Sequence, residues 1–334
     1  MSERHTLSQT FLKTTGWGAA HRAFLAGDAS DRSYDRLSLN GETAVLMDAP
    51  PGKGDDPADF IRIATHLRAL GLSAPRIMAS DLTDGFLLLE DLGNDTFARL
   101  IRSDSGRENT LYTAATNVLL HLQAHPAPQG LNDLSALDWA DAACLALDWY
   151  RFAATGERVP TSAFRTALAD VLSRHADGPR VMILRDYHAE NLLWLPERAG
   201  LARVGLLDFQ LAQMGQPGYD LVSLMQDARR DVSVEIESAV VKQFITATGA
   251  SDFTASYAAL GAQRALRIIG IFARLCLKSG KPGYLPLIPR VWGQLQRNLG
   301  HPALADVARF CEELLPEPTP EVLARIGKQC SHFP

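Results

Sequence analysis

The sequence has few cysteines and lacks a long apolar run. Its four cysteines, Cys144, Cys276, Cys311 and Cys330, lie far apart and form no C-x-x-C pair. That spacing disfavours a zinc site and a disulfide framework, so reduced thiols are expected. No run approaches the ~18 apolar residues that a membrane helix needs, and the N-terminal residues lack the apolar core of a signal peptide. We therefore expect a cytoplasmic protein that does not associate with membranes.

An excess of basic residues is also absent. The 38 acidic residues outnumber the 33 lysines and arginines, which gives a formal net charge of −5. This charge argues against general nucleic-acid binding, which usually requires a basic surface. With 334 residues the chain is long enough for two lobes or domains. The sequence points to no protein partner.

The first part of the chain is dominated by strand patterns. Two strands within residues 21–50 flank Asn40-Gly41, a dipeptide that favours a hairpin turn because both positions tolerate positive φ. Residues 57–70 have the apolar spacing of a helix, with Asp56 as its cap and Gly71 as its stop. Two further strands are predicted around the turn at 83–85.

Helical patterns dominate after Gly93, apart from a strand pair predicted at 181–184 and 203–207. No internal repeat or low-complexity segment interrupts them. These patterns predict an α+β fold with two lobes. An antiparallel-sheet lobe would span residues 1–92, and a larger helical lobe would span residues 93–334. A two-lobed protein usually binds its ligand in a cleft.

Two apolar runs each end in an aspartate. The run "VMIL" leads to Arg185-Asp186, and the run "VGLL" leads to Asp208. Asn191 follows Asp186 by five residues, which is the separation found in the catalytic loop of kinases. Phosphoryl transfer depends on positioning and charge neutralisation. An anion orients the attacking hydroxyl, and hard oxygen ligands hold a metal on the phosphates.

Further motifs make the resemblance specific. The chain resembles the aminoglycoside phosphotransferase and choline kinase group of kinase-like enzymes. Within that group it is most similar to the anomeric sugar kinases of cell-wall recycling, which phosphorylate N-acetylmuramate and N-acetylglucosamine. The motifs that carry this resemblance are Asp48-Ala49-Pro50-Pro51, Phe86 to Gly93, Arg185 to Asn191, Asp208-Phe209-Gln210, Tyr219 to Leu224, and "QRALRIIGIFARLCLKSGKPGYLPLIPRV" at 263–291.

The resemblance implies a two-lobed protein-kinase-like fold that uses ATP and Mg²⁺. The expected reaction transfers the γ-phosphate to the anomeric hydroxyl of an N-acetylated amino sugar. Asp186 would be the catalytic base, and Asn191 and Asp208 would bind magnesium. His188 would either contribute to catalysis directly or form a hydrogen bond within the loop.

Nucleotide contacts are also implied by the resemblance. The loop from Gly27 would cover the phosphates with its backbone amides, unless it is an ordinary hairpin turn. The crossover at Glu90 would meet the adenine edge through its backbone, while the Glu90 side chain would cap the strand. The full predicted set is Gly27, Asp28, Ala29, Ser30, Arg32, Glu90, Asp91 and Leu92.

The chain departs from the kinase pattern at two places. Leu184 stands where the group has the histidine of its catalytic motif. Met47 lies where kinases place a lysine on the phosphates, and the helix at 57–70 has no glutamate to pair with one. Arg32 or Lys53 would then supply the missing charge. The alternatives are weak ATP affinity, a different phosphate donor, or a nucleotide-binding pseudokinase.

The acceptor site is the least constrained part of the sequence. Gln263, Arg267, Arg274 and Lys278 lie along one stripe of a predicted helix, either as a solvated face or as a pocket wall that binds the substrate. Trp149 would either stack on a sugar ring or pack in the core. An aminoglycoside is less attractive as substrate, because a polycation requires an acidic pocket and this late segment is basic. Choline-like and homoserine-like alcohols remain as alternatives.

Overall fold

The chain divides into two compact units in the computed structural model, which describes residues 3–27, 32–54, 56–250 and 252–332. Unit 1 consists of Met1–Val118 and Ala189–Ala212, and unit 2 consists of Leu119–His188 and Gln213–Pro334. The boundary predicted after Leu92 falls inside unit 1. The division into a nucleotide-binding lobe of residues 1–92 and an acceptor-binding lobe of residues 93–334 stays a prediction.

Unit 1 contains most of the strands. Its elements are α1 (Glu3–Thr14), β1 (His21–Ala26), β2 (Ser33–Leu39), β3 (Glu42–Asp48), α2 (Pro57–Ala69), β4 (Ile77–Asp81), β5 (Phe86–Glu90), α3 (Phe97–Ser103), η1 (Ser105–Arg107), β7 (Leu192–Trp194), η3 (Gly200–Arg203) and β8 (Val204–Leu206). Helix α4 (Glu108–Gln123) begins in unit 1 and ends in unit 2.

Unit 2 is mainly helical. Its elements are α5 (Ala136–Ala143), the π-helix η2 (Ala146–Arg151), α6 (Phe152–Thr155), α7 (Ser162–His175), β6 (Val181–Ile183), β9 (Gln213–Gly215), α8 (Tyr219–Met225), α9 (Val234–Thr248), α10 (Phe253–Ser279), η4 (Pro282–Leu287), α11 (Ile288–Leu299), η5 (Pro302–Leu304), α12 (Ala305–Leu314) and α13 (Pro320–Gly327).

An antiparallel sheet in the order β1-β2-β3-β5-β4 forms the centre of unit 1. The turn between β2 and β3 is at Asn40 and Gly41, with φ values of 52° and 86°. Both values are in the left-handed region that this dipeptide tolerates, which confirms the predicted hairpin.

Helix α2 also forms where the sequence predicted it. Asp56 caps the helix by accepting a 2.8 Å hydrogen bond from the Ala58 amide, and Gly71 has a φ of 76° directly after the C-cap. The helix extends from Pro57 to Ala69. Its cap and stop are therefore the residues that the sequence indicated.

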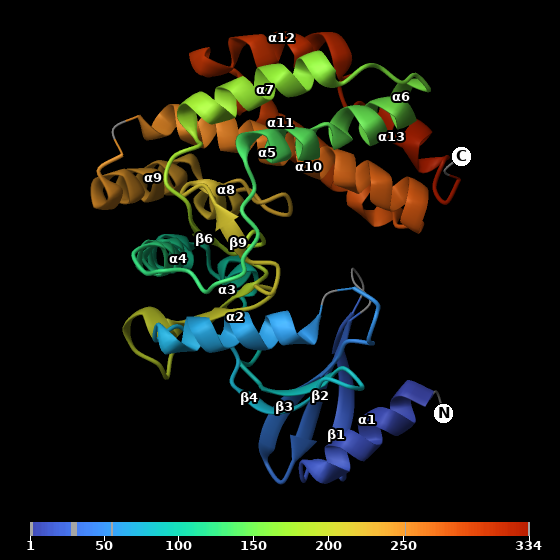
Figure 1. Cartoon of the computed structure of the whole chain (residues 1–334), viewed down its shortest axis with the longest axis vertical. Coiled ribbons are helices and arrows are strands. Elements are labelled where there is room, and N and C mark those ends of the chain that lie inside the picture. Colours follow the sequence, from blue (N-terminus) through green and yellow to red (C-terminus); the bar gives the residue numbers. More distant parts are fainter. Residues whose placement is uncertain (1–2, 28–31, 55, 251, 333–334) are drawn as a thin grey trace. The chain divides into compact units, whose positions relative to one another are not determined.

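Helix α1, which the sequence analysis did not identify, covers one face of this sheet. Phe11 stacks on Phe86 with ring centroids 5.9 Å apart, and Leu12 belongs to the same buried cluster as Leu46 and Leu88. Because side chains alternate along a strand, the residues between these point to the opposite face. Figure 1 shows α2 on that side of the sheet.

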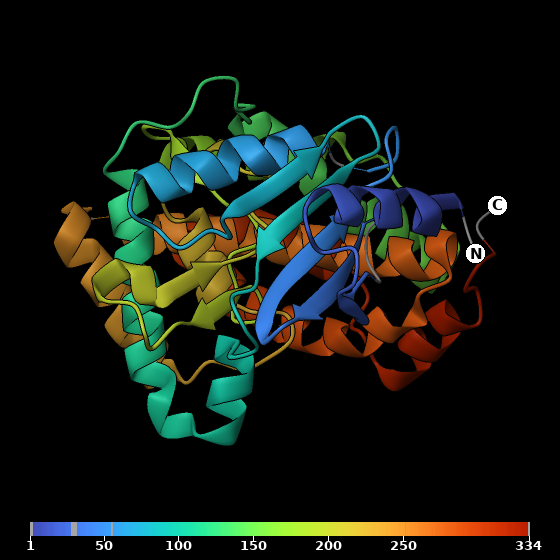
Figure 2. The ribbon, with the colours of Figure 1, turned by 90° about the horizontal axis from the view of Figure 1, so that it is seen from below.

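The two predicted strands near the motifs are present, but each has a partner that the sequence analysis missed. Strand β8 pairs with β7 in unit 1, and β6 pairs with β9 in unit 2. Phe97 of α3 packs near Trp194 of β7, and Figure 2 shows the β7–β8 hairpin beside α3. Each predicted aspartate therefore follows a strand in a short two-stranded ribbon.

Helix α10 is the central helix of unit 2. It contacts α5, α7, α8, α11 and α13 as well as the π-helix. The helix packs closely at Gly270, where an added Cβ would lie 2.2 Å from the carbonyl carbon of Leu145. The missing side chain allows the α10 backbone to pack directly against the start of the π-helix. Among the described residues, no helix is long and apolar enough to cross a membrane.

Candidate active site

A buried carboxylate holds the backbone just before Asp186. Asp220 of α8 accepts hydrogen bonds from the amides of Leu184 at 2.6 Å and Arg185 at 2.9 Å. Arg185 has a φ of 72°, an uncommon conformation for this residue type, and the two hydrogen bonds hold it there. Burial raises the pKa of Asp220 to about 7, although both amide hydrogen bonds oppose that shift. Asp220 therefore positions the chain that presents Asp186.

His188 lies two residues after Asp186 and is only 6% exposed. Burial lowers the pKa of His188 to about 3, and the charges of Arg229 and Arg264 add to this effect. The imidazole is consequently neutral at physiological pH. Its Nε2 atom is 3.5 Å from Nη1 of Arg229.

The predicted magnesium ligands lie close together in unit 1. The Asn191 carbonyl accepts a 3.0 Å hydrogen bond from the Leu207 amide at the end of the β7–β8 ribbon. Asp208 directly follows Leu207 in the chain, so this backbone hydrogen bond keeps Asp208 near Asn191. Carboxylate and amide oxygens are the hard donors that Mg²⁺ prefers, so these two side chains fit the predicted ion chemically.

Asp208 itself is held in an unusual conformation. Its φ is 55°, and its Oδ1 atom accepts a 2.9 Å hydrogen bond from Gln210 Nε2. The Arg32 guanidinium lies 3.4 Å from the same oxygen, while the Asp208 side chain keeps 43% of its surface exposed. Asp208 thus has one oxygen held by protein groups and an exposed side chain that a ligand can reach.

Arg32 is the better placed of the two candidates for the missing positive charge. Its side chain is 6% exposed and lies beside Asp208, whereas Lys53 lies on an exposed turn. Met47 is fully buried in β3.

Gly27 precedes the predicted phosphate loop, but Asp28, Ala29 and Ser30 lie outside the described residues.

The side chains at the crossover are used to hold unit 1 together. Glu90 accepts hydrogen bonds from Arg198 at 2.6 Å and from the Arg76 amide at 3.0 Å. Asp91 forms an ion pair of 2.7 Å with Arg36. These contacts agree with a structural use of both carboxylates. The adenine contacts predicted for the backbone from Glu90 to Leu92 remain predictions.

The predicted acceptor residues do not form one exposed stripe. Gln263 is fully buried and donates a 2.9 Å hydrogen bond to the Trp139 carbonyl, so it does not lie on a solvated face. Arg267 is half-buried and donates a 3.1 Å hydrogen bond to the Tyr219 hydroxyl. Arg274 is half-buried on α10, and Trp149 packs against the core of unit 2. Their roles in substrate binding stay predictions.

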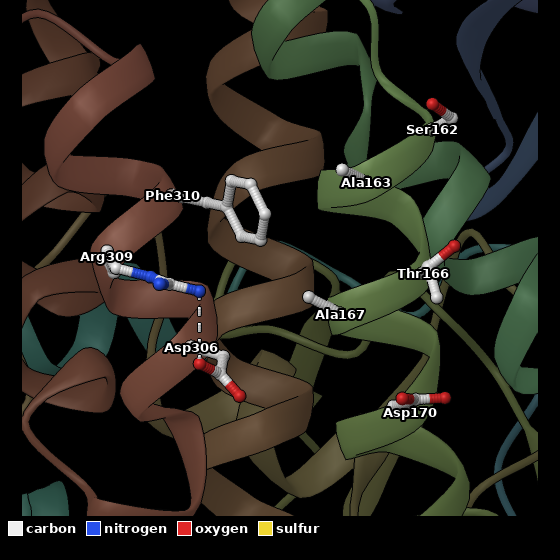
Figure 3. Close-up of a pocket in the computed structure, with 8 residues that line it drawn as sticks. All are labelled: Ser162, Ala163, Thr166, Ala167, Asp170, Asp306, Arg309 and Phe310. Atoms are coloured by element: carbon white, nitrogen blue, oxygen red, sulfur yellow. Dashed lines mark hydrogen bonds and ion pairs between the residues drawn. The ribbon is translucent and has the colours of Figure 1, made fainter.

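Unit 2 has a cavity of about 490 Å³ between α7 and α12, shown in Figure 3. Thr166 and Asp170 line one side, and Arg309, Phe310 and Asp306 line the other. Arg309 is paired with Asp306 at 3.3 Å. None of the residues that line this cavity is a predicted site residue.

Comparison with known proteins gives the family. The profile of the phosphotransferase enzyme family matches residues 21–260, well over half of the sequence. The chain belongs to this family. Its predicted identity as a small-molecule phosphotransferase of the aminoglycoside kinase type is thereby confirmed.

Two relatives of this phosphotransferase carry the same name. An N-acetylmuramate/N-acetylglucosamine kinase of Caulobacter vibrioides is 37% identical over 95% of this chain and 98% of its own length. An N-acetylmuramate/N-acetylglucosamine kinase of Pseudomonas aeruginosa is 33% identical over 90% of this chain and 91% of its own length.

Solved structures confirm the fold. An aminoglycoside-3'-phosphotransferase of type VIII has a TM-score of 0.56 and 15% identity, covering 80% of this chain and all of its own. An ethanolamine kinase of Plasmodium vivax has a TM-score of 0.58 and 10% identity, covering 86% of this chain and 83% of its own. The antiparallel sheet and the helical part therefore belong to the kinase-like fold predicted from the sequence.

Proposed function

We propose that this phosphotransferase transfers the γ-phosphate of ATP, with Mg²⁺, to the anomeric hydroxyl of N-acetylmuramate or N-acetylglucosamine. The observation that carries the proposal is the 37% identity to a kinase of that name over 95% of the chain. Nearly complete coverage means that the similarity includes the acceptor-binding part as well as the nucleotide-binding part.

The motif residues each have a role in the proposed phosphoryl transfer. The Asp186 carboxylate orients the acceptor hydroxyl and accepts its proton as the oxygen bonds to the γ-phosphorus, while the bond from that phosphorus to the bridging oxygen breaks and ADP leaves. Asn191 and Asp208 hold Mg²⁺, which neutralises phosphate charge when bound. The buried, neutral His188 supports the loop that carries Asp186. Asp220 fixes the backbone of that loop through the amides of Leu184 and Arg185.

Arg32 supplies the positive charge that kinases usually take from a strand lysine. Its guanidinium is buried beside Asp208, so it lies next to a proposed magnesium ligand. Arginine also forms bidentate contacts with phosphate oxygens. Lys53, on an exposed turn, has no comparable contact among the described residues.

The charges near Asp186 in unit 2 favour this acceptor over an aminoglycoside. Arg229 and Arg264 both act on His188, and Arg264 also interacts with Asp186. A polycationic antibiotic would be repelled by these arginines.

A pseudokinase is the second candidate, and the missing lysine–glutamate pair at Met47 and α2 is the observation that favours it.

Magnesium-dependent ATP consumption tests the proposal with a panel of acceptors. The panel contains N-acetylmuramate, N-acetylglucosamine, glucose, kanamycin, choline and homoserine. We expect turnover on the two N-acetyl sugars and a decrease in kcat of about 10²- to 10⁴-fold for Asp186→Ala, the usual contribution of a positioned base. In the same assay Arg32→Ala should raise the KM for ATP, with Lys53→Ala as its matched control.

Each other outcome has a distinct meaning. Turnover on kanamycin or choline alone would retain the mechanism and replace the acceptor. ATP binding without turnover on any acceptor would support the pseudokinase. A fully active Asp186→Ala variant would contradict the assignment of the base.

A further inference from the structure

The connection between α8 and α9 contains a turn, residues 226–231, that is held from two sides. Arg264 of α10 donates a 2.9 Å hydrogen bond to the carbonyl of Gln226. Gln294 of α11 donates a 3.0 Å hydrogen bond to the carbonyl of Asp227. Arg290 of α11 approaches the carbonyl of Ala228 at 3.5 Å. Three successive carbonyls of the turn are therefore bound by side chains of neighbouring helices.

Buried polar side chains add to this support. Gln226 and Asn298 exchange two hydrogen bonds, of 3.1 and 2.8 Å, inside unit 2. Both residues are at most 5% exposed. Placing two amides in a core is unfavourable unless they are paired, as they are here. The paired amides of Gln226 and Asn298 therefore help to hold the start of the turn.

Asp227 holds the backbone that leads to Arg229. Its Oδ1 atom accepts a 2.8 Å hydrogen bond from the amide of Arg229, and its side chain is only 1% exposed. Burial raises the pKa of the Asp227 carboxyl, and the positive charges of Arg264, Arg229 and Arg230 oppose that rise. Asp227 thus sets the direction in which the chain leaves the turn at Arg229.

The turn presents Arg229 beside the catalytic loop. Arg229 is exposed, and its Nη1 atom lies 3.5 Å from Nε2 of His188, two residues from Asp186. His188 is neutral, so it adds no positive charge that would compete for an anion. Two neighbouring arginines, Arg185 and Arg230, also have a buried Nε atom without a hydrogen-bond partner in the described part of the chain. Arg185 and Arg230 are thus further cationic residues, next to Asp186 and Arg229 in the chain.

We propose that Arg229, held by the turn at 226–231, is the residue that recognises the carboxylate of an acidic amino-sugar acceptor. This inference rests on the proposed function, since it assigns a specificity residue to the same reaction. N-Acetylmuramate differs from N-acetylglucosamine by a lactyl ether on carbon 3, which carries the carboxylate. A group that binds this carboxylate has to lie about one sugar ring from the residue that accepts the anomeric proton. The Arg229 guanidinium lies beside His188, two residues from the proposed base Asp186, and a guanidinium binds a carboxylate bidentately.

The two sugars provide the test, because only one of them has the carboxylate. For Arg229→Ala we expect the KM for N-acetylmuramate to rise about tenfold to a hundredfold, the loss of a charge-assisted hydrogen-bond pair. The KM for N-acetylglucosamine should change by less than about twofold, and kcat on both sugars should be retained. Arg229→Lys should recover part of the lost preference, because it restores the charge without the bidentate geometry.

Arg309→Ala is the matched control, since Arg309 is an exposed arginine of the same unit that pairs with Asp306 and lies over the ring of Phe310. It should leave both KM values unchanged. An equal rise for both sugars in Arg229→Ala, or no rise for either, would overturn the assignment of Arg229. Absence of turnover on both sugars in the unsubstituted enzyme would instead overturn the proposed function, and this inference with it.

Discussion

Asp220 shows how one buried carboxylate can hold a reactive segment in place. Its two oxygens accept from successive amides, those of Leu184 and Arg185, and Arg185 keeps a left-handed backbone conformation. A second residue with positive φ is Asp208, a proposed magnesium ligand. Strained backbone positions often gather at functional sites, because the surrounding structure has to hold them there.

Replacing Asp220 with asparagine should weaken this arrangement. The asparagine side chain can accept from one amide, but its NH₂ group would face the other. We expect D220N to lower the free energy of unfolding by about 1–3 kcal/mol, the usual cost of an unsatisfied buried donor. Misplacement of Asp186 should also lower kcat by about tenfold to a hundredfold. Urea denaturation and steady-state kinetics measure the two effects.

The raised pKa of Asp220 also predicts that the stability difference between D220N and the native enzyme depends on pH. The pKa of Asp220 is about 7 in the folded protein, above its ordinary value of 3.8. Between these values the unfolded chain releases the proton first, so the native enzyme loses stability as pH rises through this range. D220N has no proton to release there. Its deficit relative to the native enzyme should therefore be larger at pH 5 than at pH 8, and an equal deficit at both would contradict the raised pKa.

At the scale of elements, the contact between α10 and the π-helix depends on one missing side chain. Gly270→Ala would place a Cβ 2.2 Å from backbone atoms of Leu145, which cannot move aside as a flexible side chain would. We expect a loss of unfolding free energy of about 1–3 kcal/mol, typical of an overpacked core. Thermal and urea unfolding measure this loss.

Gly293 on α11 is a matched control for this substitution. An added Cβ at Gly293 meets nothing within 4 Å. Gly293→Ala should therefore stabilise the protein by up to about 1 kcal/mol, because alanine favours the helix more than glycine does. If the two substitutions had equal effects, close packing at Gly270 would not be their cause.

The sequence predicted those elements whose signals are local. Asn40-Gly41, the Asp56 cap and the Gly71 stop each act within a few residues, and each forms as expected. Strand pairing is not local. Strand β6 pairs with β9, and the two are separated by 29 residues that contain both motifs. No periodicity in either strand indicates that partner.

The same distinction applies to the candidate site. The spacing of Asp186 and Asn191 could be recognised directly, since a loop fixes it. Asp220 lies in an apolar stretch, and its partners are 35 and 36 residues away in the chain. Gln263 was misplaced because helical spacing shows which residues share a face, but not which face is buried. Residues defined by distant contacts were therefore missed or misread.

At the scale of the whole chain, unit 1 is formed by two separate segments. Residues 189–212 bind to the first segment through Ser73 Oγ and the Ala202 carbonyl at 2.6 Å, and through the Glu90–Arg198 pair. The ring of Phe209 packs on Phe60, with centroids 4.9 Å apart. The second segment is thus part of the core and of the polar support of this unit.

We expect a fragment of residues 1–118 to unfold without cooperativity, because it lacks these contacts. Joining residues 189–212 to it through a flexible linker should restore a cooperative transition, which circular dichroism during urea denaturation would show. The linked two-segment protein is the control, because it lacks residues 119–188 and 213–334 just as the fragment does. A sharp transition in the fragment of 1–118 alone would mean that the second segment is dispensable for folding.

The division of unit 1 into two segments also limits how such an enzyme can diversify by recombination. A single crossover exchanges one continuous stretch of sequence, and no single stretch contains unit 1 without also containing 119–188 of unit 2. A chimaera that inherits a new first segment keeps the old β7–β8 ribbon, with Asn191 and Asp208 beside it. New acceptor preferences are therefore expected to arise by substitution at positions such as the turn at 226–231, rather than by exchange of whole lobes.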